Sequence, residues 1–293
     1  MRKSGRVWLG VAIVFAAVGA SLPAHALGPE DAGIPWWAGD LAVTAGVDFS
    51  HGDYDDPIDT DLLYVPVTAT YLFDHVPWWP ERWDQIELSF TIPYLQIDGP
   101  GNFFIDERGF DRFERTREEG LGDLLLSGTY IWYPSAGSLW PIAEVGVQWK
   151  IPTGDEDRGL GTGKSDVAVE LDLSRSFGRF TPFMTVGYRF IGDPDEGELD
   201  DAWFTSLGAA MKIAPRFDAG LYWTWLQATS PTRSDGHELL AYGSFRLHDR
   251  LSLLPYVVVG LAGYAPDWGV GLTFRYEIPV RGRRSPKAAL AAR

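Results

Sequence analysis

The chain has 293 residues, with 40 acidic and 25 basic side chains and a formal net charge of −15. Nucleic-acid binding requires a basic surface, so this balance excludes that function and we expect no nucleic-acid partner. The absence of cysteine excludes disulfides and thiolate metal sites, and the length suits one large β domain.

Residues 1–26 have the features of a secretory signal peptide. Three basic residues at positions 2, 3 and 6 precede an apolar stretch, and Ala24-His25-Ala26 forms an A-x-A cleavage pattern. We expect residues 27–38 to be a periplasmic N-terminal segment and the basic, aperiodic residues 280–293 to be a disordered periplasmic tail. Beyond the N-terminus no apolar run reaches the length of a membrane-spanning helix.

Between residues 39 and 279, segments of about ten residues alternate apolar and polar side chains. In 143–151, for example, apolar residues occupy the odd positions, while Glu144 and Lys150 lie among the even ones. A period of two predicts a strand with one apolar face. A soluble β-sandwich would show the same alternation. The strand length, the aromatic strand ends and the export signal favour a transmembrane β-barrel.

The pattern predicts strands at 39–50, 62–73, 84–96, 121–133, 140–152, 165–177, 180–191, 202–213, 217–228, 238–247, 251–263 and 268–279. Most connections after odd-numbered strands are long or polar, including a loop at 97–120, and most after even-numbered strands are short. Only 74–83 and 264–267 fit this rule less well. Long extracellular loops and short periplasmic turns are typical of outer-membrane barrels.

The predicted fold is therefore all-β: a single closed antiparallel transmembrane β-barrel of about 12 strands over residues 39–279. We expect it in the outer membrane of a Gram-negative bacterium. There it would contact outer-membrane lipid and lipopolysaccharide, after insertion by the barrel-assembly machinery.

Charged residues on the polar face of these strands predict a lumen of mixed charge. Cross-strand pairing that holds the wall together is one interpretation, and a constriction that sets selectivity is the other. The sequence favours neither. The strand at 251–263 is apolar on both faces, so its register stays undecided. The lumen candidates are Glu87, Asp123, Glu144, Lys150, Glu170, Asp172, Arg189, Lys212, Arg246 and Arg275.

Two enzymatic or nucleotide-binding alternatives fit the sequence poorly. The glycine-rich loop at 158–165 resembles a phosphate-binding loop, but Arg158 stands where that pattern needs glycine, and no helix is predicted after it. An outer-membrane lipase would need a serine and a histidine on one strand face, and no mature histidine has such a serine. We therefore predict no catalytic residues and no cofactor.

Acidic clusters recur in the predicted outer loops, at 53–59, 155–157 and 193–196. Oxygen ligands at this density suit Ca²⁺ or Mg²⁺, but none of the clusters has EF-hand spacing. A solvated acidic rim is the favoured interpretation, so we predict no metal site.

Several short motifs together resemble the MetA-pathway of phenol degradation family of outer-membrane proteins, over roughly residues 40–280. The motifs are Ile92-Pro93-Tyr94, the GLGD sequence at 120–123, the KIPTGD sequence at 150–155, the GLGTGKSD sequence at 159–166, and Gly187-Tyr188 with Gly192. The resemblance implies a barrel that helps small, often aromatic or hydrophobic, compounds to cross the outer membrane.

Our leading hypothesis is thus a porin-like channel through which small organic solutes diffuse. The alternative is a structural or surface-binding barrel that presents acidic loops to partners. In that case side chains or residues 27–37 would plug its lumen. Nothing in the sequence identifies the solute.

Overall fold

The computed structural model describes residues 39–56, 58–73, 84–105, 111–135, 137–193, 199–231 and 233–278, with the backbone alone at 101–105 and 111–114. The predicted signal peptide, the N-terminal segment 27–38 and the tail 280–293 lie outside these ranges. In the part of the chain that is described, no helix is long and apolar enough to cross a membrane.

Thirteen strands and one short 3-10 turn account for the described fold. The elements are β1 (Gly39–Gly52), β2 (Thr60–Phe73), β3 (Gln85–Ile105), β4 (Asp111–Leu121), β5 (Leu124–Trp132), β6 (Ile142–Ile151), η1 (Glu156–Arg158), β7 (Asp166–Ser174), β8 (Phe180–Phe190), β9 (Ala202–Ala214), β10 (Phe217–Leu226), β11 (Gly236–His248), β12 (Leu251–Ala262) and β13 (Trp268–Ile278).

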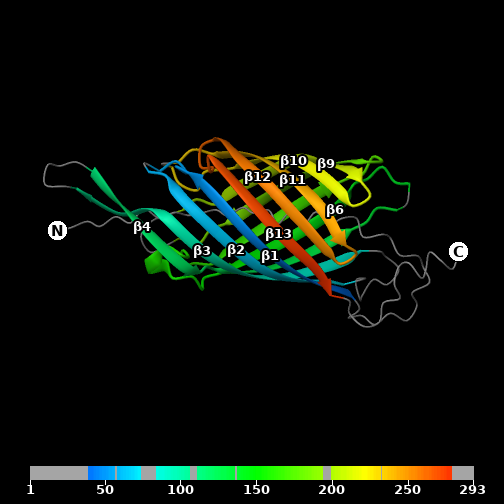
Figure 1. Cartoon of the computed structure of the whole chain (residues 1–293), viewed down its shortest axis with the longest axis horizontal. Helices are drawn as coiled ribbons and strands as arrows, with labels where there is room; N and C mark the ends of the chain where they lie inside the picture. The colour runs from blue at the N-terminus through cyan, green and yellow to red at the C-terminus, as the bar shows by residue number, and fades with distance from the viewer. Residues whose placement is uncertain are drawn as a thin grey trace.

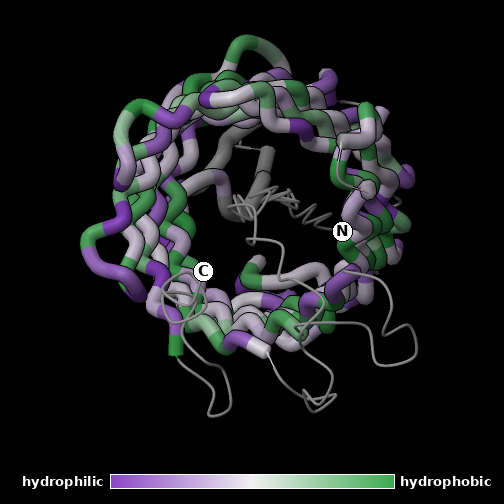
Figure 2. The backbone as a smooth tube through the Cα atoms, turned by 90° about the vertical axis from the view of Figure 1, so that its right-hand side faces the viewer, coloured by the Kyte–Doolittle hydropathy of each residue, from purple (hydrophilic) through white to green (hydrophobic). Residues whose placement is uncertain are grey.

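The sheet closes on itself. Each strand pairs with its neighbour in an antiparallel register, and β1 pairs with both β2 and β13. Strand β3 pairs with β2 on one side and with β5 on the other, so twelve strands form the closed ring seen along its axis in Figure 2. Closure leaves no free edge inside the membrane, as a spanning β-structure requires. The prediction of a closed 12-stranded antiparallel barrel is confirmed.

The prediction of a loop at 97–120 is wrong. Strand β3 continues to Ile105, and β4 returns beside it, paired from Ile105↔Asp111 to Tyr94↔Leu121. The resulting hairpin arm projects beyond one end of the barrel, where β4 is visible in Figure 1. Beyond the apolar belt no hydrocarbon imposes a pattern, and the sequence of β4 carries charged residues without the apolar alternation on which the prediction depended. All other strand ends lie within three residues of the predicted ones.

Strand β4 leads almost directly into β5, with only Gly122 and Asp123 between them. At the same end lie the long connections, including 152–165 and 227–235, whereas residues 215–216 and 249–250 form tight turns at the opposite end. Following the rule for outer-membrane barrels, we call the first end the outer mouth and the second the periplasmic end.

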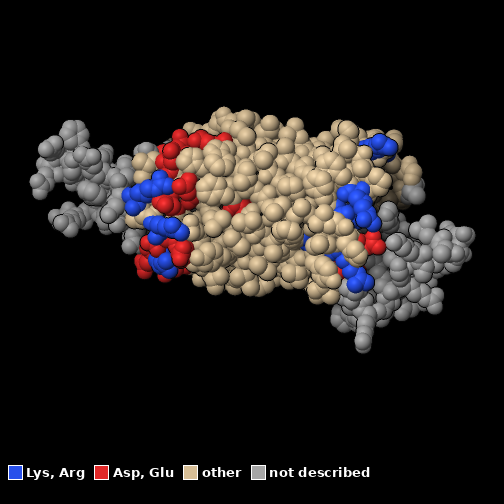
Figure 3. All heavy atoms as spheres, in the orientation of Figure 1, with Lys and Arg blue, Asp and Glu red and all other residues tan. Residues whose placement is uncertain are grey.

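One face of each barrel strand is apolar and exposed. Val147 on β6 and Val257 on β12, for example, are 46% and 49% exposed. The same outward band includes Val47, Val67, Leu88, Phe90, Leu126, Val145, Trp149, Val169, Leu171, Leu207, Leu221, Val259, Val270 and Phe274. Figure 3 shows charged side chains at the two ends and an almost uncharged belt between them. Two stacked sheets would bury these side chains; their exposure is that of a membrane belt.

The register of β12, which the sequence left undecided, follows from its pairing. Tyr256 is paired with Gly271 on one side and Tyr242 on the other, and Val258 is buried. The even positions of β12 therefore face the interior. The odd positions, such as Val257, face lipid.

Candidate functional site: the barrel interior and its outer mouth

Nine of the ten charged residues predicted for the lumen face the interior from a strand, and the tenth, Asp123, lies between β4 and β5. Directly paired residues of an antiparallel sheet share a face, so the register assigns each side chain to one side of the wall. Arg189, for example, is paired with buried Ala202. Asp123 contacts Lys150 from the start of the neighbouring strand. By the same argument from strand pairing, the interior is faced by Glu87, Glu144, Lys150, Glu170, Asp172, Lys212, Arg246 and Arg275. Their part in selectivity stays a prediction.

One side of the interior is acidic. Glu144 of β6 is paired directly with Asp172 of β7, and Glu170 lies two positions along the same strand face. The Thr185 hydroxyl donates a hydrogen bond to Asp172. The carboxylate of Glu170 lies over Gly146, where any Cβ would contact it. These carboxylates therefore form one patch on the inner wall of β6 and β7.

A second region of the inner wall, which begins beside β7, is aromatic. Tyr222, Tyr242 and Tyr256 lie on successive strands, and the ring centroids of Tyr222 and Tyr242 are 6.3 Å apart. Phe183 of β8 extends this wall, with its centroid 5.9 Å from that of Tyr222 in a T-shaped arrangement. Buried Leu240 and Val258 pack among the tyrosines. The interior therefore has an apolar aromatic wall across β8–β12.

Glycines on the neighbouring strands make room for these rings. Gly220 lies beside the Tyr242 ring, Gly271 beside Tyr256, and a Cβ at either position would overlap the ring. The phenol of Tyr256 donates a hydrogen bond to Asp48 across β13, which fixes the ring against the wall. A ring that lies flat against the wall, over a glycine, occupies less of the lumen than the same ring would if it pointed inward.

At the outer mouth, the family-like motifs converge on Lys150. Its Nζ atom lies 2.9 Å from a carboxylate oxygen of Asp166 and 3.4 Å from one of Asp123, and donates a hydrogen bond of 2.6 Å to the Thr162 hydroxyl. The three charged side chains are at most 18% exposed. Their burial makes this network stronger than a surface pair of the same length.

Asp123 also holds the start of the 152–165 loop. One carboxylate oxygen accepts the backbone N–H groups of Thr153 and Gly154 at 3.0 and 2.9 Å. Gly161 passes so close that a Cβ there would contact the same carboxylate. The glycines of the motif thus permit a tight approach, and two others, Gly159 and Gly163, adopt positive φ values of 70° and 66°.

This loop folds into the barrel mouth. Leu160 is only 3% exposed and packs against Leu62, Tyr64 and Leu95, which line the inner face of β2 and β3. Arg158 attaches the loop to the hairpin arm, because its Nε donates a hydrogen bond of 2.8 Å to Glu118 of β4. The loop therefore narrows the mouth on the side of β2 and β3.

Loops from distant parts of the chain join on the other side of the mouth. Arg233 forms an ion pair with Asp56 at 3.1 Å and stacks over the Tyr264 ring at 4.5 Å. Burial raises the pKa of the Asp56 carboxyl, and the Arg233 guanidinium opposes this shift. The Tyr54 ring, 6.0 Å from Tyr264, adds an aromatic contact to this collar.

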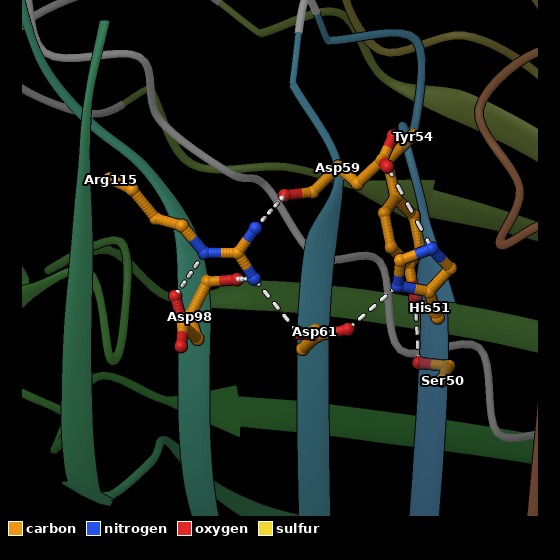
Figure 4. Close-up of polar contacts among 7 residues, drawn as sticks. All are labelled: Ser50, His51, Tyr54, Asp59, Asp61, Asp98 and Arg115. Atoms are coloured by element: carbon orange, nitrogen blue, oxygen red, sulfur yellow. Dashed lines mark hydrogen bonds and ion pairs between the residues drawn. The ribbon is translucent and has the colours of Figure 1, made fainter.

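On the outer face, a chain of charges ties the hairpin arm to the barrel (Figure 4). Arg115 of β4 donates to Asp98 of β3 at 2.5 Å and to Asp61 of β2 at 2.8 Å. Asp61 in turn contacts Nδ1 of His51 on β1 at 2.7 Å. The chain thus crosses four neighbouring strands above the apolar belt.

Ser50, His51 and Asp61 share residue types with a hydrolase triad, yet they cannot act together. Adjacent residues of a strand point to opposite faces, so Ser50 faces the interior and His51 the outside. The Ser50 hydroxyl instead accepts a hydrogen bond from Tyr54 at 2.6 Å. Elsewhere, the glycine-rich loop 158–165 leads into strand β7, with no helix to receive a phosphate. Within the described ranges, no His, Asp and Glu side chains group so as to hold a metal ion.

The sequence reasoning missed several interior residues. Asp48 lies on the inner face of β1, and Glu238 on that of β11, paired with Thr224. The period of two would have found both, because each occupies the polar face of a predicted strand. Tyr256 and Phe204 had no such signal, because apolar residues on an inner face resemble those that meet lipid.

No curated protein matches the sequence. Among solved structures, the chain is similar to the COG4313 outer membrane channel from Pseudomonas putida F1, with a TM-score of 0.65 and 14% identity, covering 86% of this chain and 100% of that one. It is also similar to the transport unit of the autotransporter AIDA-I from Escherichia coli, with a TM-score of 0.50 and 10% identity, over 90% of this chain and 95% of that one. At these identities the similarity establishes the barrel fold.

The closed barrel and its apolar belt place the chain in the outer membrane of a Gram-negative bacterium. The model of the family described as "Putative MetA-pathway of phenol degradation" matches residues 41–279, which is the whole barrel including the motifs around Lys150. The chain therefore belongs to this family.

Proposed function

We propose that the protein is an outer-membrane channel through which small organic solutes, aromatic compounds among them, diffuse. The observation that carries the proposal is the two-sided interior. Aromatic rings line β8–β12, and carboxylates and hydroxyls line β3–β7. An interior with both surfaces contacts a phenol ring and its hydroxyl at the same time. Membership of the phenol-degradation family and the similarity to a solved outer membrane channel support this function.

Several inward positions are in contact with solvent, which supports an aqueous path, while others such as Tyr222 and Tyr242 are buried. Gln148 faces the interior from β6 and is exposed, as are Lys212 and Arg246 near the periplasmic end. Inward residues of a fully packed barrel would instead be buried like a protein core. Lipid and lipopolysaccharide around the apolar belt, and insertion by the barrel-assembly machinery, belong to the same proposal.

The absence of cysteine makes a direct test possible. Gln148→Cys places one thiol on the inner wall, and Val147→Cys places one on the lipid face next to it. The refolded variants would be measured in planar bilayers before and after a bulky, membrane-impermeant thiol reagent is added. We expect the conductance of Gln148→Cys to fall and that of Val147→Cys to stay unchanged. Absence of conductance in the unlabelled protein would exclude the channel.

A liposome-swelling panel of phenols, fatty acids and sugars then addresses the solute class. We expect phenols to enter faster than sugars of similar size, because only the phenols gain from the aromatic wall. Equal rates for all solutes of one size would indicate a general pore.

A second candidate, a barrel closed at its mouth, is favoured by one observation: the 152–165 loop packs Leu160 inside the barrel. In that case wild-type protein would not conduct, and releasing the loop would open it. The same bilayer experiment on Leu160→Ala separates the two functions.

A further inference from the structure

We infer that the lumen passes cations in preference to anions, so that among organic solutes of one size a protonated amine crosses faster than a carboxylate. The inference rests on the proposed channel function and adds the sign of charge that the channel selects. It concerns the charge lining a path and requires no fixed ion-binding site.

The first support is the balance of charge on the inner wall. Among the described strand residues that face the interior, acidic side chains outnumber basic ones. The acidic ones are Asp40, Asp48, Glu87, Glu144, Asp166, Glu170, Asp172, Asp218, Glu238 and Glu277. The basic ones are Lys150, Arg189, Lys212, Arg246 and Arg275.

The basic groups are also less free to attract anions. Lys150 lies between two carboxylates at the mouth, and its charge is compensated there. Arg189 of β8 interacts electrostatically with the same Asp166, and Arg275 does so with Glu87. Lys212 and Arg246 lie near the ends of β9 and β11, where solvent screens them.

The acidic patch on β7 lacks this compensation. Glu170 and Asp172 lie on one strand face, and in the described structure neither has a basic group within 4.0 Å. Asp172 accepts the Thr185 hydroxyl, and Glu170 interacts electrostatically with Asp172 itself. Two ionised carboxylates without a basic partner raise the local concentration of cations at this wall and repel anions, so the test is made at alkaline pH.

The wall across the lumen from β6, the strand of Glu144, also favours cations. In the closed ring of twelve strands, β12 lies six strands from β6, and therefore faces it across the lumen. Tyr256 on β12 belongs to the aromatic wall together with Tyr222 and Tyr242. Ring faces attract ammonium groups and not carboxylates, so the two walls select the same sign of charge.

The test is the reversal potential of the refolded channel in a planar bilayer under a KCl gradient. We expect potassium to be at least about threefold more permeant than chloride. Glu170→Gln combined with Asp172→Asn should bring the ratio close to one. Glu119→Gln is the matched control, because Glu119 lies on the outer face of the hairpin arm and is half-exposed. It should leave the ratio unchanged.

Two further measurements extend the test to organic ions. Replacing KCl on one side with benzylammonium chloride gives the permeability of benzylammonium relative to potassium, and replacing it in a separate experiment with potassium benzoate gives that of benzoate relative to chloride. We expect benzylammonium to be the more permeant ion. A conducting channel that prefers chloride or benzoate, or shows no preference, overturns the inference and leaves the channel function standing. No conductance in any salt overturns both. A heat-dependent shift in electrophoretic mobility shows that each variant has folded. If the double variant does not fold, Glu238→Gln tests the cation preference at a second acidic position.

Discussion

The Nζ atom of Lys150 lies 2.9 Å from Oδ2 of Asp166, the first residue of the next strand. This pair closes the base of the 152–165 loop, and Asp123 binds both Lys150 and the backbone of Thr153 and Gly154. Motifs that lie apart in the sequence therefore form one structure, an inward-folded loop at the outer mouth. The family resemblance rests largely on these motifs, and the contacts within the loop give a physical reason for the residue types found there.

Lys150→Met should release this loop. The substitution leaves Asp123 and Asp166 facing each other without a cation, at a cost of about 1–3 kcal/mol. Because the loop contains Arg158 and Lys164, we expect trypsin to cut it about tenfold faster than in the wild type. Lys212→Met, which removes an exposed lysine at the other end, is the control. An unchanged cleavage rate would contradict the role of the network.

Leu160→Ala should loosen the loop from the inside. Leu160 packs on Leu62, Tyr64 and Leu95, and truncating such a buried leucine costs about 2–5 kcal/mol. As the loop leaves the mouth, single-channel conductance should rise while the barrel stays folded. Leu261→Ala, at an outward position 56% exposed, should change neither conductance nor cleavage. A lower conductance would show that the loop supports the pore instead of narrowing it.

Adjacent substitutions on β6 test the two faces of the wall. Val147→Arg puts a charge into hydrocarbon and should destabilise the barrel by about 2–4 kcal/mol. Gln148→Arg puts the same charge into the lumen and should cost little. The measurement is the urea midpoint of unfolding in detergent or liposomes, followed by heat-modifiable mobility. Equal midpoints for the two variants would refute the assignment of faces.

Gly187→Ala should be destabilising although it adds one methyl group. Its Cβ would overlap the Phe204 ring on the next strand, and such overpacking costs about 1–3 kcal/mol. Gly128→Ala, on the outer face, would meet only Leu88 at 3.4 Å and should be tolerated. Thermal unfolding of both variants compares the costs. Similar melting temperatures would show that the ring moves aside freely.

Arg115→Gln should free the hairpin arm without weakening the barrel. Arg115 is 46% exposed, so its ion pairs with Asp61 and Asp98 contribute at most about 1 kcal/mol. The β4 amides should nevertheless exchange hydrogen faster, because this arginine joins β4 to β2. Arg117→Gln, which loses one hydrogen bond to Gln96, should have a smaller effect. If both variants exchange alike, the charge chain of Figure 4 does not hold the arm.

The barrel was predictable because the membrane imposes a local rule on every strand. Each second side chain of segments such as 143–151 meets hydrocarbon, and its neighbours meet a polar interior, so the sequence alternates there. For the same reason the inward orientation of Glu144, Glu170 and Arg189 was predictable from their position in the alternation.

The rest depended on contacts between segments that the sequence separates. Strand β4 escaped prediction because it lies beyond the apolar belt and its sequence does not alternate. The register of β12 escaped it because the inner face of that strand is apolar too. The alternation shows which side of the wall a residue faces, but not what lies across the lumen. Barrel closure decides that, because it sets Tyr256 of β12 across the lumen from β6 and joins Asp123, Lys150 and Asp166 at the mouth.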